Sequence, residues 1–262
     1  MELIVDGSKA YAHTGGRPFD PALPAIVLIH GAGADHTVWS LQTRYLAHHG
    51  RSVLAVDLPG HGRSEGPPLD SVAAIGDWTA HLIEAAGAEQ AAIAGHSLGA
   101  LAALECAARH PARVRALALL GCSAKMPVHP DLLAAAQAGE QLAFDLVTDW
   151  GFGRPSHLGG HRAPGLWMTG GGTRLLESGP GGALGTDMTA ANAYQDGMAA
   201  AAKVSCPALL IAGAVDRMTP AKAGRKLADA IAGAEMVVLA ATGHMMMVEN
   251  PDAALDAMKT IL

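Results

Sequence analysis

A serine between two glycines is the first candidate for chemistry in this chain. The segment GHSLG at residues 95–99 follows a short apolar run and precedes a helical pattern. The turn in such a strand–turn–helix segment is sharp, and it presents the serine hydroxyl at a strand end, beside the free N–H groups of a helix N-terminus. A serine hydroxyl is a good nucleophile only when a neighbouring base takes its proton. The pattern therefore predicts nucleophilic attack by Ser97 on a carbonyl carbon.

The base and the acid that orients it must also follow strand ends. Among the 13 histidines, His244 lies after an apolar run at 235–239 and before the last helical pattern. Asp216 follows the apolar run at 208–212. The chain order Ser97, Asp216, His244 is the order that accompanies a serine turn of this type. We therefore predict a triad of nucleophile, orienting acid and base.

Other residues compete for these roles. Asp216 could instead be a helix-entry aspartate, favoured there by the helix dipole. The strand expected at 114–120 ends in Gly121-Cys122-Ser123 and offers no carboxylate, although Cys122 and Ser123 are the nearest competing nucleophiles. His30 also ends a strand, but it leads into a glycine pair that suggests a different role. The remaining histidines near expected helix ends are interpreted as structural, namely His48, His49 and His110.

The oxyanion that forms during acyl transfer needs two hydrogen-bond donors. We expect them to be the N–H groups of Leu98, which follows the nucleophile, and of Ala32 in the segment HGAG at 30–33. The same glycines and Asp57 imitate a dinucleotide-binding pattern, but the third glycine position holds His36. His157 and His161 are four residues apart in a glycine-rich stretch without helical pattern, so no metal site is expected. We predict that no metal or organic cofactor is required.

Alternating apolar runs and helical patterns indicate an α/β fold with a mostly parallel sheet. The expected strands are 2–6, 10–14, 25–30, 52–57, 90–94, 114–120, 208–212 and 235–239. The expected helices are 37–48, 71–86, 98–109, 220–231 and 251–262. Thr219 and Asn250 each precede a proline, which is typical of a capping residue before a helix.

The alternation stops between residues 123 and 203. This segment contains one helical pattern at 131–147 and then a stretch, 151–185, with twelve glycines. It could be a disordered surface excursion, but its large apolar side chains favour a packed cap: Trp150, Phe152, Trp167, Met168 and Tyr194. We predict a core formed by residues 1–122 and 204–262 and a helical, glycine-rich cap at 123–203. The cap is expected to act as a mobile lid that sets substrate choice.

Composition excludes several classes of protein. Of the 262 residues, 50% are hydrophobic and 16% are charged, which excludes a disordered chain, and the net charge is −6. A net negative charge without basic runs argues against nucleic acid and anionic membranes as partners. The three scattered cysteines favour a reducing compartment. With no signal peptide and no apolar run long enough to span a membrane, the expected location is cytoplasmic.

These motifs resemble those of the α/β-hydrolase superfamily, within which the chain is similar to small bacterial serine esterases, enol-lactonases and cofactor-free haloperoxidases. The segments that carry the resemblance are HGAG, DLPGHGRS at 57–64, GHSLG, AGAVDRMTP at 212–220 and ATGHMMMVENP at 241–251. The resemblance implies an eight-stranded sheet with an antiparallel second strand and a cap after the sixth. It also implies a structural role for residues 57–64. A serine at position 97 departs from haloalkane dehalogenases and epoxide hydrolases, which carry aspartate there.

The predicted function is hydrolysis of a small apolar carboxylic ester or lactone through an acyl-enzyme. Substrate contacts are expected from Gly31, from Met245 in the methionine run 245–247, and from Trp167 in the cap; core filling is the alternative for that run. Other reactions on the same triad stay open: carbon–carbon bond hydrolysis, perhydrolase or haloperoxidase-like chemistry, and amide hydrolysis. A non-catalytic ligand-binding protein is a further alternative. The residues leave open whether the chain forms a homo-oligomer.

Overall fold

The computed structural model describes residues 1–157 and 166–262. One sheet of eight strands forms its centre, in the order β1-β2-β4-β3-β5-β6-β7-β8. Strand β2 runs antiparallel to both of its neighbours, whereas the pairs from β4 through β8 are parallel. The strands are β1 (Glu2–Val5), β2 (Ser8–His13), β3 (Ala25–Ile29), β4 (Ser52–Val56), β5 (Ala91–His96), β6 (Val114–Leu120), β7 (Ala208–Gly213) and β8 (Glu235–Leu239). All eight expected strands are present, and the expected fold class is confirmed.

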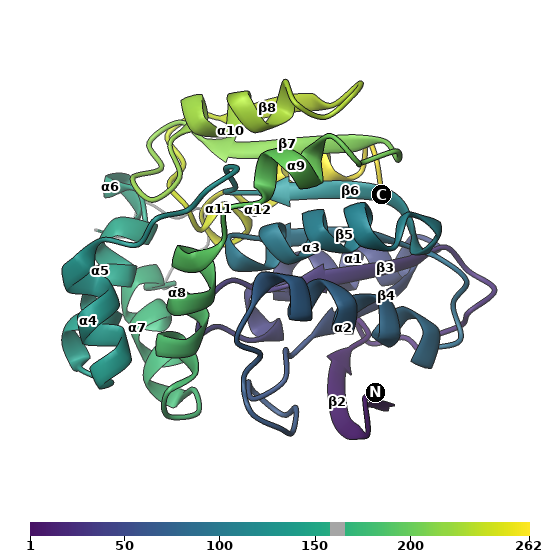
Figure 1. The fold of residues 1–262 in the computed structure, drawn as a ribbon, viewed down its shortest axis with the longest axis horizontal. Coiled ribbons are helices and arrows are strands. Elements are labelled where there is room, and N and C mark those ends of the chain that lie inside the picture. The colour runs from purple at the N-terminus through teal and green to yellow at the C-terminus, as the bar shows by residue number, and fades with distance from the viewer. Residues whose placement is uncertain (158–165) are drawn as a thin grey trace.

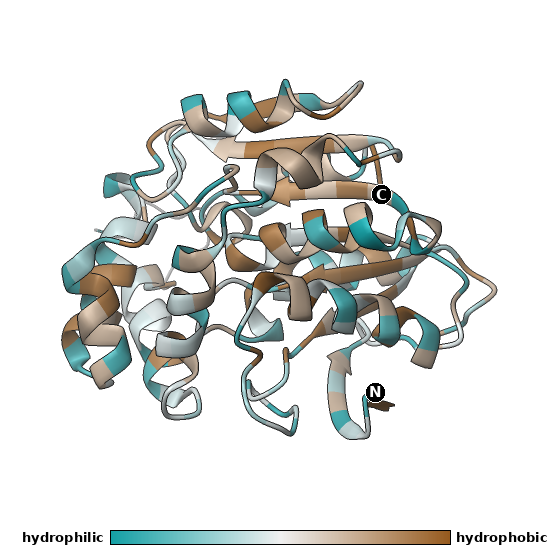
Figure 2. Ribbon diagram, viewed as in Figure 1, coloured by the Kyte–Doolittle hydropathy of each residue, from teal (hydrophilic) through white to brown (hydrophobic). Residues whose placement is uncertain are grey.

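The central strands are buried along their whole length because helices cover both faces of the sheet. Figure 2 shows these strands as the most hydrophobic part of the fold. One face carries α2 (Val72–Ala85), α3 (Leu98–Arg109), α9 (Gly197–Ala201) and α10 (Ala221–Ala228). The other carries the 3-10 helix η1 (His36–Trp39), α1 (Ser40–His48), α11 (Met246–Glu249) and α12 (Pro251–Met258). Among the described residues, no helix combines the length and apolar character needed to cross a membrane.

The expected helices are present with different ends. The helix expected at 37–48 begins as η1, capped by the Asp35 side chain, which accepts from the Thr37 N–H. The helix expected at 220–231 is shorter, and its N-cap position is Pro220 with no side-chain cap, so Thr219 lies one residue before the cap. Asn250 makes no side-chain cap to α12 either. Thr219 and Asn250 therefore do not cap the two helices as the sequence suggested.

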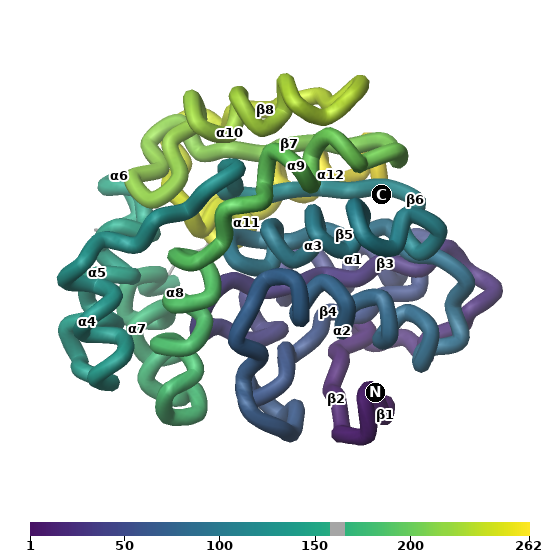
Figure 3. Tube along the Cα trace, viewed as in Figure 1, coloured from purple at the N-terminus to yellow at the C-terminus, as the bar shows by residue number. Residues whose placement is uncertain are grey.

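A cap of helices lies beyond the carboxyl ends of the parallel strands (Figure 1). It comprises α4 (Pro130–Ala138), α5 (Gln141–Gly151), α6 (Arg154–His157), α7 (Met168–Ser178) and α8 (Ala183–Ala193). The tube in Figure 3 shows α4, α5, α7 and α8 gathered at this end of the molecule. The single helix expected at 131–147 is split in two at Gly139, which has φ +68°. The described residues of the glycine-rich stretch, 151–157 and 166–185, include α6, α7 and the start of α8.

The cap has a small apolar core of its own, which includes Leu132, Leu176, Leu184 and Met188. The inserted segment then returns to the main body, because α9 packs against α3 and its alanines join the larger core. The cap is thus a separate layer that covers one end of the sheet and remains anchored where the chain leaves and re-enters the core.

Candidate active site

Ser97 occupies the turn between β5 and α3. Its backbone has φ 53° and ψ −118°, a conformation that residues other than glycine rarely adopt, so the turn is strained. A Cβ on Gly95 would lie 2.1 Å from the Gly99 carbonyl oxygen, and a Cβ on Gly99 would lie 2.4 Å from the His30 carbonyl oxygen. The Ser97 N–H donates to the carbonyl of Leu120 at 2.9 Å. The turn is therefore fixed against β6, and it holds the half-buried serine at the carboxyl edge of the sheet.

His244 and Asp216 form a buried pair beside this turn. Nδ1 of His244 lies 2.8 Å from Oδ2 of Asp216, and the two side chains are 3% and 0% exposed. Because a carboxylate only accepts, Nδ1 carries the hydrogen, and Nε2 of the neutral ring holds the lone pair. This Nε2 is buried and has no hydrogen-bond partner among the described residues. His244 is thus oriented with its accepting nitrogen unbonded in the described part of the chain, which is the arrangement that a general base requires.

Asp216 is held as a carboxylate by several donors. Its Oδ1 accepts from the backbone N–H groups of Met218 and Thr219, both at 2.8 Å. Its Oδ2 accepts from the Thr219 hydroxyl at 2.7 Å as well as from His244. Burial raises the pKa of Asp216, but the charge of His244 and these hydrogen bonds outweigh burial and bring that pKa below its ordinary value. The ionised carboxylate can therefore stabilise the imidazolium that forms when His244 takes a proton.

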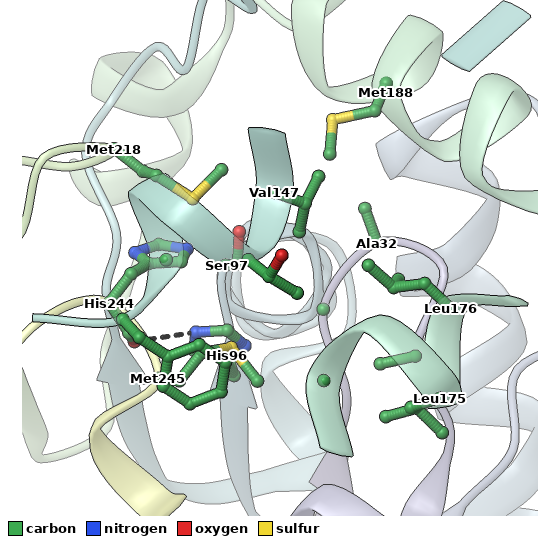
Figure 4. A pocket seen from close by; sticks show the side chains of 16 residues that line it. Ala32, His96, Ser97, Val147, Leu175, Leu176, Met188, Met218, His244 and Met245 are labelled. Atoms are coloured by element: carbon green, nitrogen blue, oxygen red, sulfur yellow. Dashed lines mark hydrogen bonds between the residues drawn. The ribbon is translucent and has the colours of Figure 1, made fainter. Parts of the chain in front are cut away.

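The loop that carries His244 is held from two sides. From the cap, the Gly151 carbonyl accepts the backbone N–H groups of His244 and Met245 at 2.8 and 3.1 Å. From the core, Nε2 of His96 donates to the His244 carbonyl at 3.0 Å, the dashed line in Figure 4. Burial, followed by the proximity of His244, keeps the pKa of His96 well below its ordinary value. His96 is therefore neutral, and it positions the base without adding a charge.

Two backbone donors beside Ser97 are unpaired. The N–H groups of Ala32 and Leu98 have no acceptor in the described part of the chain. Leu98 is the first residue of α3, where a helix offers no internal partner to its N–H groups. Gly31 allows the Ala32 loop to approach, since a Cβ there would lie 2.8 Å from Nδ1 of His96. Unpaired donors near a serine hydroxyl are what a developing oxyanion requires.

Two cavities meet at Ser97 and His244. The first, shown in Figure 4, holds about 50 Å³, and both side chains face into it. Its other walls are mainly apolar and include Val147, Phe152, Leu175, Leu176 and Met245. The second holds about 300 Å³ and adds polar groups from His129, Trp150 and Arg217. A reacting carbon at Ser97 therefore has a small apolar space on one side and a wider, mixed space on the other.

The residues predicted to contact substrate do not all reach these cavities. Gly31 and Met245 line the first cavity. Trp167 lines neither cavity, which corrects our expectation that it contacts substrate: the residue is 69% exposed. The reason is local packing, since a Cβ on Gly170 would lie 2.2 Å from the Trp167 ring. The indole that the cap contributes to the site belongs to Trp150, at the end of α5.

The competing nucleophiles lie outside both cavities. Cys122 is buried, and burial raises the pKa of its thiol to about 12. The Ser123 hydroxyl donates to the carbonyl of Lys125 at 2.7 Å. Neither residue lines a cavity beside Ser97. Of the histidine pair noted in the sequence, His157 bonds to a cap carbonyl, and His161 lies outside the described residues.

His30 and Asp57 support loops of the core. Nδ1 of His30 donates to the carbonyl of Gly31 at 2.8 Å, and its Nε2 accepts the N–H of Leu58 at 3.1 Å. Burial, followed by the neighbouring His61, lowers the pKa of His30 to about 4. Asp57 accepts from two backbone N–H groups and one imidazole. Both residues therefore have their polar atoms engaged in holding the chain.

Sequence reasoning missed the polar residues that support the triad: His96, Thr219 and Glu249. Oε2 of Glu249 accepts from the N–H groups of Gly153 and Gly243, at 2.9 and 3.2 Å. It also accepts from the Ser156 hydroxyl at 2.8 Å. Glu249 thus joins the end of the cap to the residue before His244. For Thr219, a signal was present in its spacing three residues after Asp216, which suits a side-chain turn.

This chain is similar in sequence to known proteins. Residues 26–257 match the alpha/beta hydrolase family. A pimeloyl-(acyl-carrier protein) methyl ester esterase from Chromobacterium violaceum is 32% identical over 237 residues, which cover 84% of this chain and 87% of that protein. An uncharacterized protein of Mycobacterium bovis is 42% identical over 89 residues, so the chain spans about a quarter (26%) of that relative's length.

The fold comparison covers nearly the whole chain. The enol-lactonase from Burkholderia xenovorans LB400 has a TM-score of 0.88 and 26% sequence identity, and the match covers 99% of this chain and 98% of that one. The similar region therefore includes the cap as well as the sheet.

Proposed function

The chain belongs to the alpha/beta hydrolase family, and from that premise we propose that it is a serine hydrolase of carboxylic esters or lactones. One observation carries the proposal. The strained Ser97 and Nε2 of His244 face one cavity, beside the N–H groups of Ala32 and Leu98, and neither Nε2 nor these donors have a partner among residues 1–157 and 166–262. That combination supplies a nucleophile, a base and a site for negative charge.

The proposed reaction proceeds in two stages. Nε2 of His244 takes the proton of Ser97 as its Oγ attacks the carbonyl carbon, and the N–H groups of Ala32 and Leu98 bind the oxyanion. His244 then gives the proton to the departing alkoxide, which leaves an acyl group on Ser97. Water, deprotonated by His244, attacks the acyl carbon; His244 then returns that proton to Oγ of Ser97 as the acid leaves. Asp216 holds the ring orientation and stabilises its charge throughout.

The cavities define the proposed substrate. The first, about 50 Å³ of mainly apolar space, admits a group of only a few heavy atoms. The second, about 300 Å³, admits a larger and more polar group. We therefore propose a small, largely apolar ester or lactone, and the similarity to an enol-lactonase supports including lactones.

A cytoplasmic location stays a prediction, as does the absence of a nucleic-acid or membrane partner; self-association stays open.

A fluorophosphonate probe and a substrate panel test the proposal. The probe should label the peptide that contains Ser97, and the enzyme should turn over short-chain aryl esters and simple lactones. Ser97→Ala should lose both labelling and at least roughly 1,000-fold in kcat. The matched control is Ser123→Ala, which removes a nearby hydroxyl that lines neither cavity.

The panel also separates the alternatives. Labelling without turnover of any ester or lactone, but with turnover of amides, peracid precursors or vinylogous diketones, would move the assignment to another reaction on the same triad. Absence of labelling would favour a non-catalytic ligand-binding protein. A fully active Ser97→Ala combined with an inactive Cys122→Ala would contradict the proposed mechanism.

A further inference from the structure

We infer that Asp187, in cap helix α8, is a positioning residue for the oxyanion loop of the core. The inference rests on the proposed function, since it assigns Asp187 a role in that reaction. Asp187 is 1% exposed, and its Oδ2 accepts the backbone N–H of Gly33 at 2.8 Å. Gly33 directly follows Ala32, whose N–H is the proposed oxyanion donor. A carboxylate of the cap thus binds the residue next to the donor.

The second partner of Asp187 explains how a buried carboxylate can be kept there. Nε2 of His61 lies 3.0 Å from Oδ2 of Asp187, and Nδ1 of His61 lies 3.0 Å from the carbonyl of Pro59. Carboxylate and carbonyl oxygens both accept, so both ring nitrogens of His61 carry hydrogens and the ring is an imidazolium. Two opposite charges buried together, each with a further hydrogen bond, satisfy one another. The pair is therefore a fixed connection between cap and core.

Packing holds the same loop from the other direction. Gly33 has φ +66°, and a Cβ there would lie 2.9 Å from Cδ1 of Leu184 and 3.1 Å from Cδ2 of Leu176. These leucines belong to α8 and α7. The peptide after Ala32 is thus enclosed by the cap and bound by Asp187, which limits rotation of the Ala32 backbone.

Asp187 acts at a distance from the substrate. Neither Asp187 nor His61 lines a cavity at Ser97. The pair therefore cannot contact the reacting atoms, and its effect must pass through the loop. Loosening the loop should weaken oxyanion binding in the transition state while leaving substrate binding nearly unchanged.

The test compares Asp187→Ala, Asp187→Asn and Tyr194→Phe with the wild type. Asp187→Ala should lower kcat roughly 10- to 100-fold with KM within about threefold, because the donor is loosened rather than removed. Asp187→Asn keeps an acceptor for Gly33 and should restore most of kcat. Tyr194→Phe is the matched control, since it breaks another buried bond to the core, from the Tyr194 hydroxyl to Oε1 of Glu105 at 2.6 Å.

The outcomes separate this inference from the proposed function. If the wild type neither labels with fluorophosphonate nor hydrolyses esters, the proposed function fails first. If the wild type is active but Asp187→Ala loses no more kcat than Tyr194→Phe, Asp187 is only a structural residue and the inference fails. Should Asp187→Ala not fold, Asp187→Glu keeps the charge and displaces it by one methylene. Its kcat should then fall at least about fivefold, and a kcat equal to that of the wild type overturns the inference.

Discussion

Gly121 offers a test of the His244 position that leaves every triad residue in place. Gly121 follows β6 with φ +58°, and a Cβ built there would lie 2.9 Å from both Cε1 and Nδ1 of His244. Carbon atoms in contact are ordinarily about 3.5–4.0 Å apart. In Gly121→Ala the imidazole must therefore move by roughly half an ångström or more. The hydrogen bond from the Gly121 N–H to the Ile211 carbonyl is retained, because alanine keeps its N–H.

Two effects of this substitution must be distinguished. Alanine in a left-handed conformation costs about 1–2 kcal/mol of stability wherever it occurs. Displacement of the base should lower kcat roughly 10- to 100-fold, because small errors in the position of a reacting group are costly. Gly233→Ala is the matched control: Gly233 has φ +73°, and nothing lies within 4 Å of its built Cβ.

The assay combines urea unfolding with ester kinetics. Both variants should lose the stability that a left-handed alanine costs, Gly121→Ala should lose more because it also displaces the buried His244 ring, and only Gly121→Ala should lose kcat. Equal kcat values in the two variants would refute the reasoning, because they would show that the His244 ring can move without consequence or that it is not the base.

Three further predictions concern the cap, the cofactor requirement and acid stability. Trp150→Ala should change the preferred size of ester substrate, whereas Trp167→Ala should not; chain-length profiles of aryl esters measure both. Activity should survive dialysis against EDTA, and dependence on an added divalent ion would contradict the mechanism. The Arg109 hydrogen bond lowers the pKa of Asp77 to about 2. The stabilisation of the folded state by ionised Asp77 is therefore present above pH ~4 and is lost as pH falls toward 2. Asp77→Asn should then lower the free energy of unfolding by roughly 1 kcal/mol at pH 7, a figure already reduced for the exposure of Asp77 to solvent. Between pH ~4 and ~2, the free energy of unfolding measured with urea should change less in the variant than in the wild type.

The sheet could be predicted from the sequence because its strands obey a local rule. Runs such as AIVLI at 25–29 and ALLIA at 208–212 are apolar throughout, which only a strand covered on both faces permits. The positions of Ser97, Asp216 and His244 followed from the same rule, since the carboxyl ends of parallel strands share one edge. The strands and the candidate residues thus came from short segments of the chain, whereas the order of the strands in the sheet was not predicted from it.

The cap and the supporting polar residues could not be predicted in the same way. Whether a tryptophan faces the site or solvent depends on how cap helices pack, and no local pattern separates Trp150 from Trp167. Thr219 preceded a proline and looked like a helix cap, yet the helix cap is Pro220, and the Thr219 hydroxyl donates to the carboxylate of Asp216. His61 and Asp187 are 126 residues apart, and their pairing depends on tertiary structure alone.

The bonds between cap and core bear on how substrate can enter. Opening the whole cap would break the His61–Asp187 pair and the hydrogen bonds from His244 and Met245 to Gly151. Because those contacts hold the Ala32–Gly33 loop and His244, a rigid-body opening would displace both parts of the proposed catalytic site at once. Motion of the lid predicted from the sequence is therefore better sought within α7, which lines the smaller cavity and makes neither of these hydrogen-bonded connections, whereas α5 ends at Gly151 and makes one of them. Hydrogen exchange should accordingly be slow at the N–H groups of Gly33, His244 and Met245, and faster at the exposed residues of α7; uniform rapid exchange over all of them would mean that the cap opens as one body.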